Sequence, residues 1–285
     1  MIYLPDSFID QLLLDDIQYG DLTTRSLGLH TQAGTMTLVS KQGGCISGID
    51  IASRMLNKLG IDFQANYRDG DVVPENSCLI KASGTVEALH QAWKAVQNVL
   101  EWCCGVSHYT HQMVSLLKRY QPDAQLACTR KTVPGTKLLA LTAIIAGGAI
   151  IHRAGSAESI LLFTNHRRCL ADPDDWHSHI HTLREAAPEK QIIVEADNRQ
   201  QATLAIEAGA DIVQLDKFSP AQIRQLHQQI QTQNRLCRLS AAGGINLQTI
   251  EAYAQTGIRL FVTSAPYYAP PQRYQSKHFH RIDLI

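Results

Sequence analysis

The stretch IIVEADNRQQATLAIEAGADIVQLD, residues 192–216, holds the unit that decides the fold. Two mainly apolar runs each predict a short buried strand, and a helical segment separates them. The runs are residues 191–194, which begin one residue before the stretch, and residues 211–215. An acidic residue, Glu195 or Asp216, follows each run. A strand, a helix and a second strand in this order predict two parallel strands of one sheet.

The same alternation extends from about Gly105 to the last part of the chain. This span is too short for a closed barrel of eight strands, which typically needs about 250 residues. An α/β fold with an incomplete parallel barrel of six or seven strands fits better, and a doubly wound open sheet is the alternative. The other strands are expected at residues 125–128, 149–151, 159–162, 238–240 and 260–262.

The first hundred residues mix strands and helices and predict a separate α+β region. Strands are expected at residues 34–40, 63–67 and 78–82, where apolar and polar residues alternate. We therefore divide the chain into an N-terminal domain and a barrel domain. Their expected bounds are 1–105 and 106–269, with a tail, 270–285, that could pack back on the first domain.

Composition and charge argue against several classes of protein. Lys and Arg together number 26, as do Asp and Glu, so the net charge is zero and a nucleic-acid or membrane-surface binder is not expected. No apolar run approaches the ~20 residues of a membrane span, and the N-terminus lacks the pattern of a secretory signal. The seven cysteines are scattered without CxxC spacing, which favours reduced thiols in the cytoplasm.

Basic residues follow two of the predicted strands. Arg130 and Lys131 come soon after the strand at 125–128, and His152 and Arg153 follow the next one. Ligands of parallel α/β folds bind at the carboxyl ends of the strands, so these side chains are expected in one mouth. Arginine suits bidentate recognition of carboxylate or phosphate, and lysine acts as a point charge on phosphate. The alternative for the first pair is a solvated surface position, which fits less well before the rigid turn TVPG.

Acidic residues and glycines complete the predicted mouth. Glu195 and Asp216 could bind ribose hydroxyls or a Mg²⁺ that bridges pyrophosphate oxygens. Gly243 and Gly244 are expected to open a helix at residues 246–256, so that their backbone N–H groups cradle a phosphate. Taken singly, Glu195 could cap a helix, Asp216 could form a surface ion pair, and the two glycines could be only a tight turn.

Three histidines, His177, His179 and His181, resemble a metal-binding tract. Residues 176–187 read as a helix, however, and side chains two positions apart on a helix face different directions. We expect these histidines to be exposed, and no zinc-like spacing occurs elsewhere.

The order of the motifs resembles the quinolinate (nicotinate-nucleotide) phosphoribosyltransferase family. Within it the chain looks most like the divergent branch of ModD proteins, named for an association with molybdenum-transport genes. The resemblance covers nearly the whole chain. In chain order the motifs are DDIQYGDLTT (15–24), KAVQNVLEWCCGVSH (94–108), TRKTVPGTKLL (129–139), AGGAIIHR (146–153), NH (165–166), VEADN (194–198), QLDKF (214–218) and AAGGINLQTIEAYAQTGI (241–258).

The resemblance implies an N-terminal α/β sandwich, an incomplete barrel and a role for each residue of the mouth. Lys94 stands where the family has an arginine that reaches into the neighbouring subunit's pocket, which implies a homodimer or higher homo-oligomer with shared active sites. By position, Arg130, His152 and Arg153 correspond to family residues that bind the pyridine dicarboxylate, and Phe163 and His166 are further candidates for substrate binding. The catalytic residues around phosphoribosyl pyrophosphate and its Mg²⁺ are Lys131, Glu195 and Asp216, and the phosphate-binding turn is Gly243 and Gly244.

The sequence departs from the family pattern at three places. Phe163 falls where the family has a pocket lysine, and Lys217 replaces an asparagine after Asp216. The glycine-containing phosphate loop after the last strand reads TSAPYYAPP, with Pro266, Tyr267 and Tyr268 in place of small residues.

The expected function is that of a pentosyltransferase. It would transfer a phosphoribosyl group from phosphoribosyl pyrophosphate to a small planar, acidic N-heterocycle and release pyrophosphate, with Mg²⁺ as cofactor. The departures predict that quinolinate itself is a poor substrate. One alternative is a non-catalytic anion- or nucleotide-binding regulatory protein that kept the mouth, and another is a different phosphate-binding barrel enzyme such as an isomerase.

Overall fold

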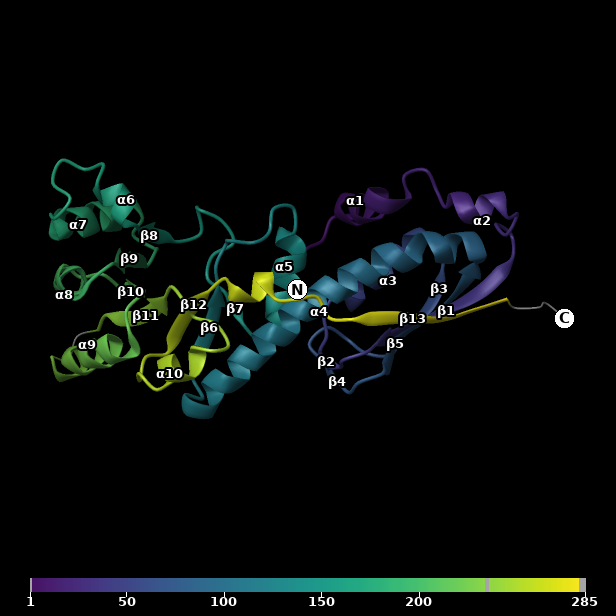
Figure 1. The fold of residues 1–285 in the computed structure, drawn as a ribbon. Helices are drawn as coiled ribbons and strands as arrows, with labels where there is room; N and C mark the ends of the chain where they lie inside the picture. Colours follow the sequence, from purple (N-terminus) through teal and green to yellow (C-terminus); the bar gives the residue numbers. More distant parts are fainter. Residues whose placement is uncertain (1, 234–235, 282–285) are drawn as a thin grey trace. The chain divides into compact units, whose positions relative to one another are not determined.

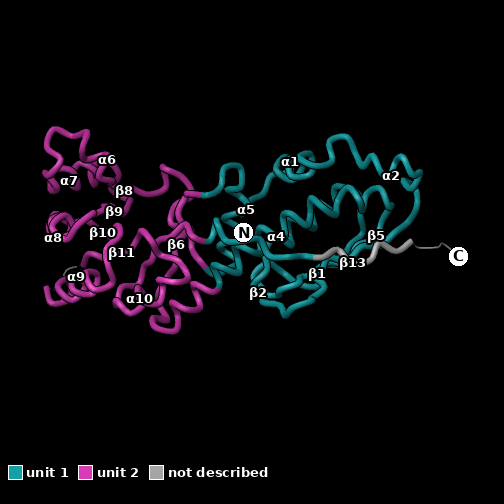
Figure 2. The backbone as a smooth tube through the Cα atoms, viewed as in Figure 1, with its two compact units in different colours: residues 1–111, 132–148, 266–285 teal, residues 112–131, 149–265 magenta. Residues whose placement is uncertain are grey.

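The structure is a computed structural model that describes residues 2–233 and 236–281, with side chains described as far as Tyr274. The chain forms two compact units (Figure 2). Unit 1 comprises residues 1–111, 132–148 and 266–285, and unit 2 comprises residues 112–131 and 149–265. Residue 105, where the sequence places a domain boundary, lies inside the 35-residue helix α4 (Val86–Tyr120).

Unit 1 contains a four-stranded antiparallel sheet in the order β13-β1-β5-β3. In β1 the side chains of Met36 and Leu38 are buried two positions apart, as expected of a strand with one face on a core. The tail returns to this sheet, because β13 pairs with β1 from Tyr274 opposite Ser40 to Arg281 opposite Gly34. Residues 282–285 of the predicted tail lie outside the described residues. The strands are β1 (Ala33–Ser40), β3 (Asp62–Ala65), β5 (Ser77–Thr85) and β13 (Tyr274–Arg281), with a small pair β2 (Gly44–Cys45) and β4 (Val72–Val73).

The helices of unit 1 bury apolar stripes. In α3 the residues at helical spacing, Ile51, Met55 and Leu56, are fully buried. The hydroxyl of Thr85 accepts a hydrogen bond from the amide of Ala88 at 3.2 Å, which caps the start of α4. The other helices of this unit are α1 (Asp6–Ile17), α2 (Leu22–Ser26), α3 (Ile49–Lys58) and α5 (Lys137–Ala146).

Unit 2 is built on a seven-stranded parallel sheet in the order β7-β6-β12-β11-β10-β9-β8 (Figure 1). From β8 to β12 each strand pairs with the next in the chain, and β12 then pairs with β6, which pairs with β7. The strands therefore advance in one sense around a barrel that stays open between β7 and β8. This order excludes the doubly wound alternative, in which the direction reverses, and confirms the incomplete barrel.

All seven strands predicted for the barrel are present, with bounds that agree to within two residues. They are β6 (Gln125–Cys128), β7 (Ile150–Ile151), β8 (Ile160–Leu162), β9 (Ile192–Ala196), β10 (Ile212–Asp216), β11 (Arg238–Ala242) and β12 (Leu260–Thr263). The helices between them are α6 (Thr164–Arg167), α7 (Trp176–Ala186), α8 (Arg199–Glu207), α9 (Pro220–Thr232) and α10 (Ile250–Ala254), and a 3₁₀ helix η1 (Ala265–Tyr268) follows β12.

The helix predicted at residues 246–256 is wrong at its start, because α10 begins only at Ile250. The side chain of Asn246 accepts hydrogen bonds from the amides of Gln248 and Thr249 and holds this segment as a turn. The hydroxyl of Thr249 also donates to the carbonyl oxygen of Gly244 at 2.8 Å. The paired glycines therefore lead into a turn and do not open a helix directly.

Across residues 2–233 and 236–281, no helix is both long and apolar enough to cross a membrane.

Candidate active site

A cavity of about 830 Å³ lies at the carboxyl ends of the barrel strands, and every residue that lines it belongs to unit 2. We call it the mouth cavity. It brings together all the predicted site residues except Lys94 and His166. Those that line it are Arg130, Lys131, His152, Arg153, Phe163, Glu195, Asp216, Gly243 and Gly244.

Basic side chains from the ends of β6 and β7 form one side of the mouth cavity. The two strands are paired, Cys128 opposite Ile151, and the amide of His152 donates to the carbonyl oxygen of Cys128 at 2.9 Å. Burial and the neighbouring charge of Arg153 lower the pKa of His152, which keeps its imidazole neutral near pH 7. Burial and the charge of Arg130 likewise lower the pKa of Arg153. The cations disfavour one another, so an anion bound between them would relieve their repulsion.

Arg153 is the most informative of these residues. Its side chain is 7% exposed, and its guanidinium carbon lies 5.3 Å from the centre of the Phe163 ring. No carboxylate within the described part of the chain forms an ion pair with it. A buried cation without a counter-charge is costly. An anion bound beside Arg153 would supply the missing counter-charge.

Two carboxylates from the ends of β9 and β10 form the opposite side. Glu195 is half-buried and accepts a hydrogen bond from the side-chain amide of Gln214 at 3.3 Å. Burial raises the pKa of Glu195, and the charges of Asp216 and Asp197 raise it further, whereas Lys131 lowers it. The two acids of the mouth cavity thus repel one another in the absence of a bound cation.

The turn after β11 passes closely over Asp216. Gly243 has a φ of +82°, and a Cβ atom there would lie 2.8 Å from Oδ1 of Asp216 and 2.7 Å from Cγ of Lys217. Only glycine fits this position, since it has the required φ and no side chain. Lys217, itself at a φ of +57°, places its ammonium 3.8 Å from Oδ2 of Asp216. Lys217 lines the cavity as its fourth cation, after Arg130, Lys131 and Arg153, and it lies beside Asp216.

Sequence reasoning missed two buried polar residues beside Glu195. Gln214 and Ser240 are buried, and both are in register with Glu195 across β9, β10 and β11. The side-chain oxygens of Gln214 and Ser240 have no hydrogen-bond partner among the residues that the structure describes. Their signal in the sequence was a single polar residue within each apolar strand, DIVQLD and RLSAA.

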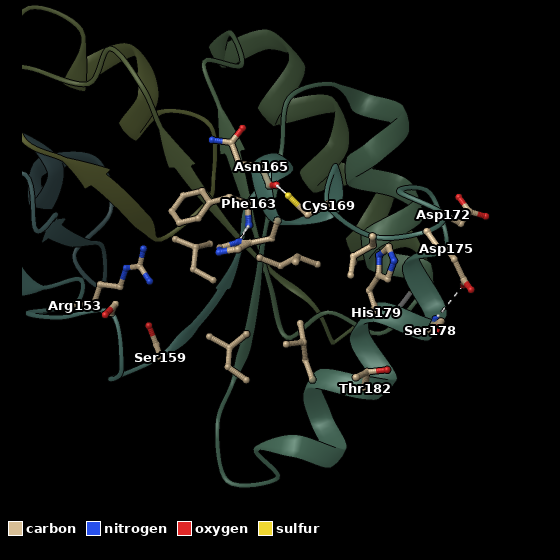
Figure 3. Close-up of a pocket in the computed structure, with 18 of the residues that line it drawn as sticks. Arg153, Ser159, Phe163, Asn165, Cys169, Asp172, Asp175, Ser178, His179 and Thr182 are labelled. Carbon is tan, nitrogen blue, oxygen red and sulfur yellow. Dashed lines mark hydrogen bonds between the residues drawn. The ribbon is translucent and has the colours of Figure 1, made fainter.

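Lys94 and His166 lie elsewhere. Lys94 is exposed on α4 in unit 1, where its ammonium donates to Oε1 of Gln97 at 3.3 Å and lies 4.6 Å from the ring of Trp93. His166 accepts a hydrogen bond at Nδ1 from the amide of Phe163 at 3.1 Å. It lines a second cavity of about 990 Å³, which we call the side cavity and which lies along β8, α6 and α7 (Figure 3).

The remaining predictions concern residues outside the mouth cavity. Pro266, Tyr267 and Tyr268 do not line it, although Ser264 and Ala265 just before them do. His177 and His181 are exposed on α7, as predicted, but the prediction is wrong for His179, which is half-buried because it lines the side cavity. Within residues 2–233 and 236–281, no group of three or more histidines, cysteines or acids could by itself hold a metal ion.

Comparison with known proteins fits this architecture. The sequence model described as "Quinolinate phosphoribosyl transferase, N-terminal domain" matches residues 21–104, and the corresponding C-terminal domain matches residues 106–272. The chain belongs to the quinolinate phosphoribosyltransferase family. It is therefore an enzyme of the pentosyltransferase class, and the resemblance seen in its motifs is confirmed.

Relatives of this phosphoribosyltransferase are found at two levels of similarity. The chain is 53% identical over 271 residues to the ModD protein of Escherichia coli O6:H1, which is named as a pyrophosphorylase, and the match covers 95% of each chain. It is 35% identical to the ModD protein of Rhodobacter capsulatus, over 92% of this chain and 100% of that one. The nicotinate-nucleotide pyrophosphorylase of Francisella tularensis is a solved structure with a TM-score of 0.86, 25% identity and coverage of 96% and 97%.

Proposed function

We propose that this enzyme transfers a phosphoribosyl group from phosphoribosyl pyrophosphate to a small planar, acidic N-heterocycle and releases pyrophosphate. The observation that carries the proposal is the division of the mouth cavity between unpaired cations and repelling carboxylates. Arg130 and Arg153 suit an anionic acceptor, and Glu195 with Asp216 suits the ribose and a cation on the pyrophosphate. The turn at Gly243 supports the same assignment, because it brings backbone close to Asp216.

The reaction needs positioning and charge more than a covalent nucleophile. A lone pair of the ring nitrogen forms a bond to the anomeric carbon of the ribose. The bond from that carbon to the pyrophosphate oxygen breaks, and pyrophosphate leaves with the electron pair. Negative charge grows on the leaving group, and Lys131 beside the acids would stabilise it.

The acidic side of the mouth cavity fits a Mg²⁺ ion that is bound together with phosphates. Mg²⁺ commonly binds through one or two carboxylates plus substrate phosphates and waters. Glu195 and Asp216 supply the two carboxylates, and their mutual repulsion is an independent sign that a cation belongs between or near them. When bound, Mg²⁺ would neutralise charge on the pyrophosphate. The chain's own residues would hold the ion and orient the sugar.

The acceptor should carry fewer anionic groups than quinolinate. Quinolinate has two adjacent carboxylates, and each needs a partner when it is buried. Arg130 and Arg153 line the mouth cavity, and the family resemblance adds Lys94 of a neighbouring subunit. Phe163 falls where the family has a fourth cation, a lysine. An aromatic face provides stacking for a flat ring and no neutralisation. A heterocycle with one carboxylate fits this wall better.

We further propose a homodimer or higher homo-oligomer with shared active sites. Lys94 is exposed and has no acidic partner among the described residues, although it corresponds to a cross-subunit arginine of the family. A mass measurement in solution at micromolar concentration should therefore give at least two chains. A monomer that is fully active would contradict the shared site.

The free state of all seven cysteines supports a reducing compartment, and we propose the cytoplasm.

The central experiment measures pyrophosphate release and ligand binding side by side. Pyridine mono- and dicarboxylates are offered with phosphoribosyl pyrophosphate, either with Mg²⁺ or with a chelator. We expect Mg²⁺-dependent release with at least one monocarboxylate. Saturating phosphoribosyl pyrophosphate and Mg²⁺ should stabilise the fold by about 2–4 kcal/mol in a thermal-shift measurement. Stabilisation without release for any acid would instead indicate a non-catalytic binding protein.

A further inference from the structure

The side cavity lies against the mouth cavity and shares part of its wall. The residues that line both cavities are Arg130, Arg153, Leu161 and Phe163. The strands β7 and β8 are the two free edges of the sheet, so the barrel is open between them. Arg153 follows β7 and Phe163 follows β8. The two cavities therefore meet at the opening of the barrel.

The walls of the side cavity differ in kind from those of the mouth cavity. Apolar side chains from β8 and α7, Ile160, Leu162 and Leu183 among them, form much of the surface. Arg153 and Phe163 lie at one end of the cavity, and His179 with Ser178 lies at the other (Figure 3). An apolar cavity with cations at one end suits a ligand that has a charged end and an apolar body.

Two buried polar atoms on these walls also lack partners. Oγ of Ser159 and Nδ1 of His179 have no hydrogen-bond partner among the described residues, and both residues line the side cavity. Buried polar groups are normally satisfied. A ligand or an ordered water in the side cavity would satisfy them after a small adjustment of the side chains.

Phe163 stands where the two cavities meet. Its ring is half-buried, contacts the guanidinium of Arg153 and lies 5.7 Å from the ring of His166, centre to centre. The hydrogen bond from its amide to His166 holds the backbone at this point. The junction thus presents an aromatic ring between an arginine and an imidazole, which are groups that contact flat aromatic ligands favourably.

We propose that the natural acceptor is a heterocyclic monocarboxylate that carries an apolar aromatic substituent, and that this substituent occupies the side cavity. Arg130 and Arg153 hold the carboxylate, and the substituent passes the ring of Phe163. The volume of about 990 Å³ is ample for a further ring. This inference rests on the proposed function for the transfer step, but ligand binding in the two cavities can be measured without that step.

The first measurement compares three acids by calorimetry with the parent enzyme. The probes are pyridine-3-carboxylate and its 5-phenyl and 6-phenyl derivatives, each with and without phosphoribosyl pyrophosphate and Mg²⁺. Burying a phenyl ring should tighten binding of at least one derivative about tenfold or more. Equal affinity for all three acids would overturn the inference, and would be the result if a second copy of the chain fills the side cavity.

The second measurement uses two neighbouring positions on α7. Thr182 is exposed and lines the side cavity, whereas His181 is exposed and lines neither cavity. Thr182→Trp should remove the phenyl advantage and leave the affinity for pyridine-3-carboxylate unchanged, which also shows that the variant is folded. His181→Trp should keep the advantage. An undiminished advantage in Thr182→Trp would place the substituent elsewhere and overturn the inference.

Failure of the inference and failure of the proposed function give different results. Pyrophosphate release with pyridine-3-carboxylate, together with no phenyl advantage, overturns the side-cavity inference and leaves the transfer reaction standing. A phenyl advantage that is lost in Thr182→Trp, together with no release for any acid, supports the side-cavity inference and contradicts the transfer reaction.

Discussion

The two sides of the mouth cavity carry opposite charge and are built in different ways. On the side of β6 and β7, Arg130 and Arg153 follow the strands, and Arg153 is buried without an ion pair among the described residues. On the side of β9 and β10, Glu195 lies within its strand and is hydrogen-bonded to Gln214, and Asp216 has Lys217 beside it. The positive charge of Arg153 has no counter-charge on the basic side. On the acidic side, Gln214 and Lys217 already offset part of the negative charge of the two carboxylates.

This difference indicates which side selects the ligand. An uncompensated cation gains most from a matching anion, so the basic side should decide the affinity for the acidic heterocycle. The acidic side should act mainly through a bound cation and should decide the rate, because it handles the charge of the leaving group. Substitutions on the two sides should therefore separate binding from turnover.

The largest effect is expected at Lys131, which lines the mouth cavity and whose charge lowers the pKa of Glu195. Replacing it by alanine removes a charge that would stabilise the leaving pyrophosphate. Loss of one such electrostatic contact typically lowers kcat by about 10²–10³-fold. Steady-state kinetics of pyrophosphate release by the parent and Lys131→Ala measure this fall in kcat. Lys137→Ala is the matched control, since Lys137 is exposed at the start of α5 and does not line the mouth cavity. Equal losses in both variants would mean that the effect is not local.

The second largest effect is expected at Phe163, which stands on the basic side where the family has a lysine. We expect the parent to use quinolinate poorly, with a kcat/KM below roughly 10⁴ M⁻¹s⁻¹. Phe163→Lys adds a charge beside Arg153 and should raise that value about 10–100-fold through a new charge-assisted contact. Phe163→Met keeps an apolar side chain and should give no gain. Efficient use of quinolinate by the parent would contradict the prediction.

A smaller change is expected in affinity when Arg130 is lost. Arg130→Ala removes one exposed cation from the basic side, and Arg153 remains. A charge-assisted hydrogen bond contributes about 1.5 kcal/mol at the low end of its range, so the Kd for a pyridine monocarboxylate should rise about tenfold. Calorimetry checks this, with Lys118→Ala on α4 as an exposed control that does not line the mouth cavity. Unchanged binding would mean that the acid is held elsewhere.

The sequence predicted the barrel well because each strand has a local signal. Short apolar runs that end at polar residues marked all seven strands, and their carboxyl ends place Arg130 and Glu195 in one cavity, as parallel strands require. The predicted start of α10 was wrong. The side chains of Asn246 and Thr249 form hydrogen bonds that close a turn, whereas the spacing of apolar residues alone predicts a helix there. The side cavity had no local signal, since it depends on the opening between β7 and β8.

The smallest effect concerns the acidic side and its response to pH. Burial and the charge of Asp216 raise the pKa of Glu195 in the folded state, so the folded protein binds this proton more tightly than the unfolded chain does. The free energy of unfolding therefore falls as pH rises from the ordinary glutamate range through the raised pKa. Above the raised pKa, this loss of stability is complete. Glu195→Gln removes the titrating group and keeps an acceptor for Gln214. Without ligand, it should be slightly more stable than the parent near neutral pH, by less than about 1 kcal/mol after allowance for solvent screening.

Denaturant unfolding of the parent and Glu195→Gln at several pH values tests this prediction. The gain in stability should shrink as pH falls below the raised pKa, because the parent then takes up its proton and loses the penalty. Glu189→Gln is the matched control, since Glu189 is exposed and lines neither cavity. Mg²⁺ with phosphoribosyl pyrophosphate should reverse the order, because the bound cation would stabilise the parent, with two carboxylates, more than the variant, with one. A gain that is independent of pH would show that the pKa of Glu195 is not raised, and the acidic side would lose this indication of a cation site.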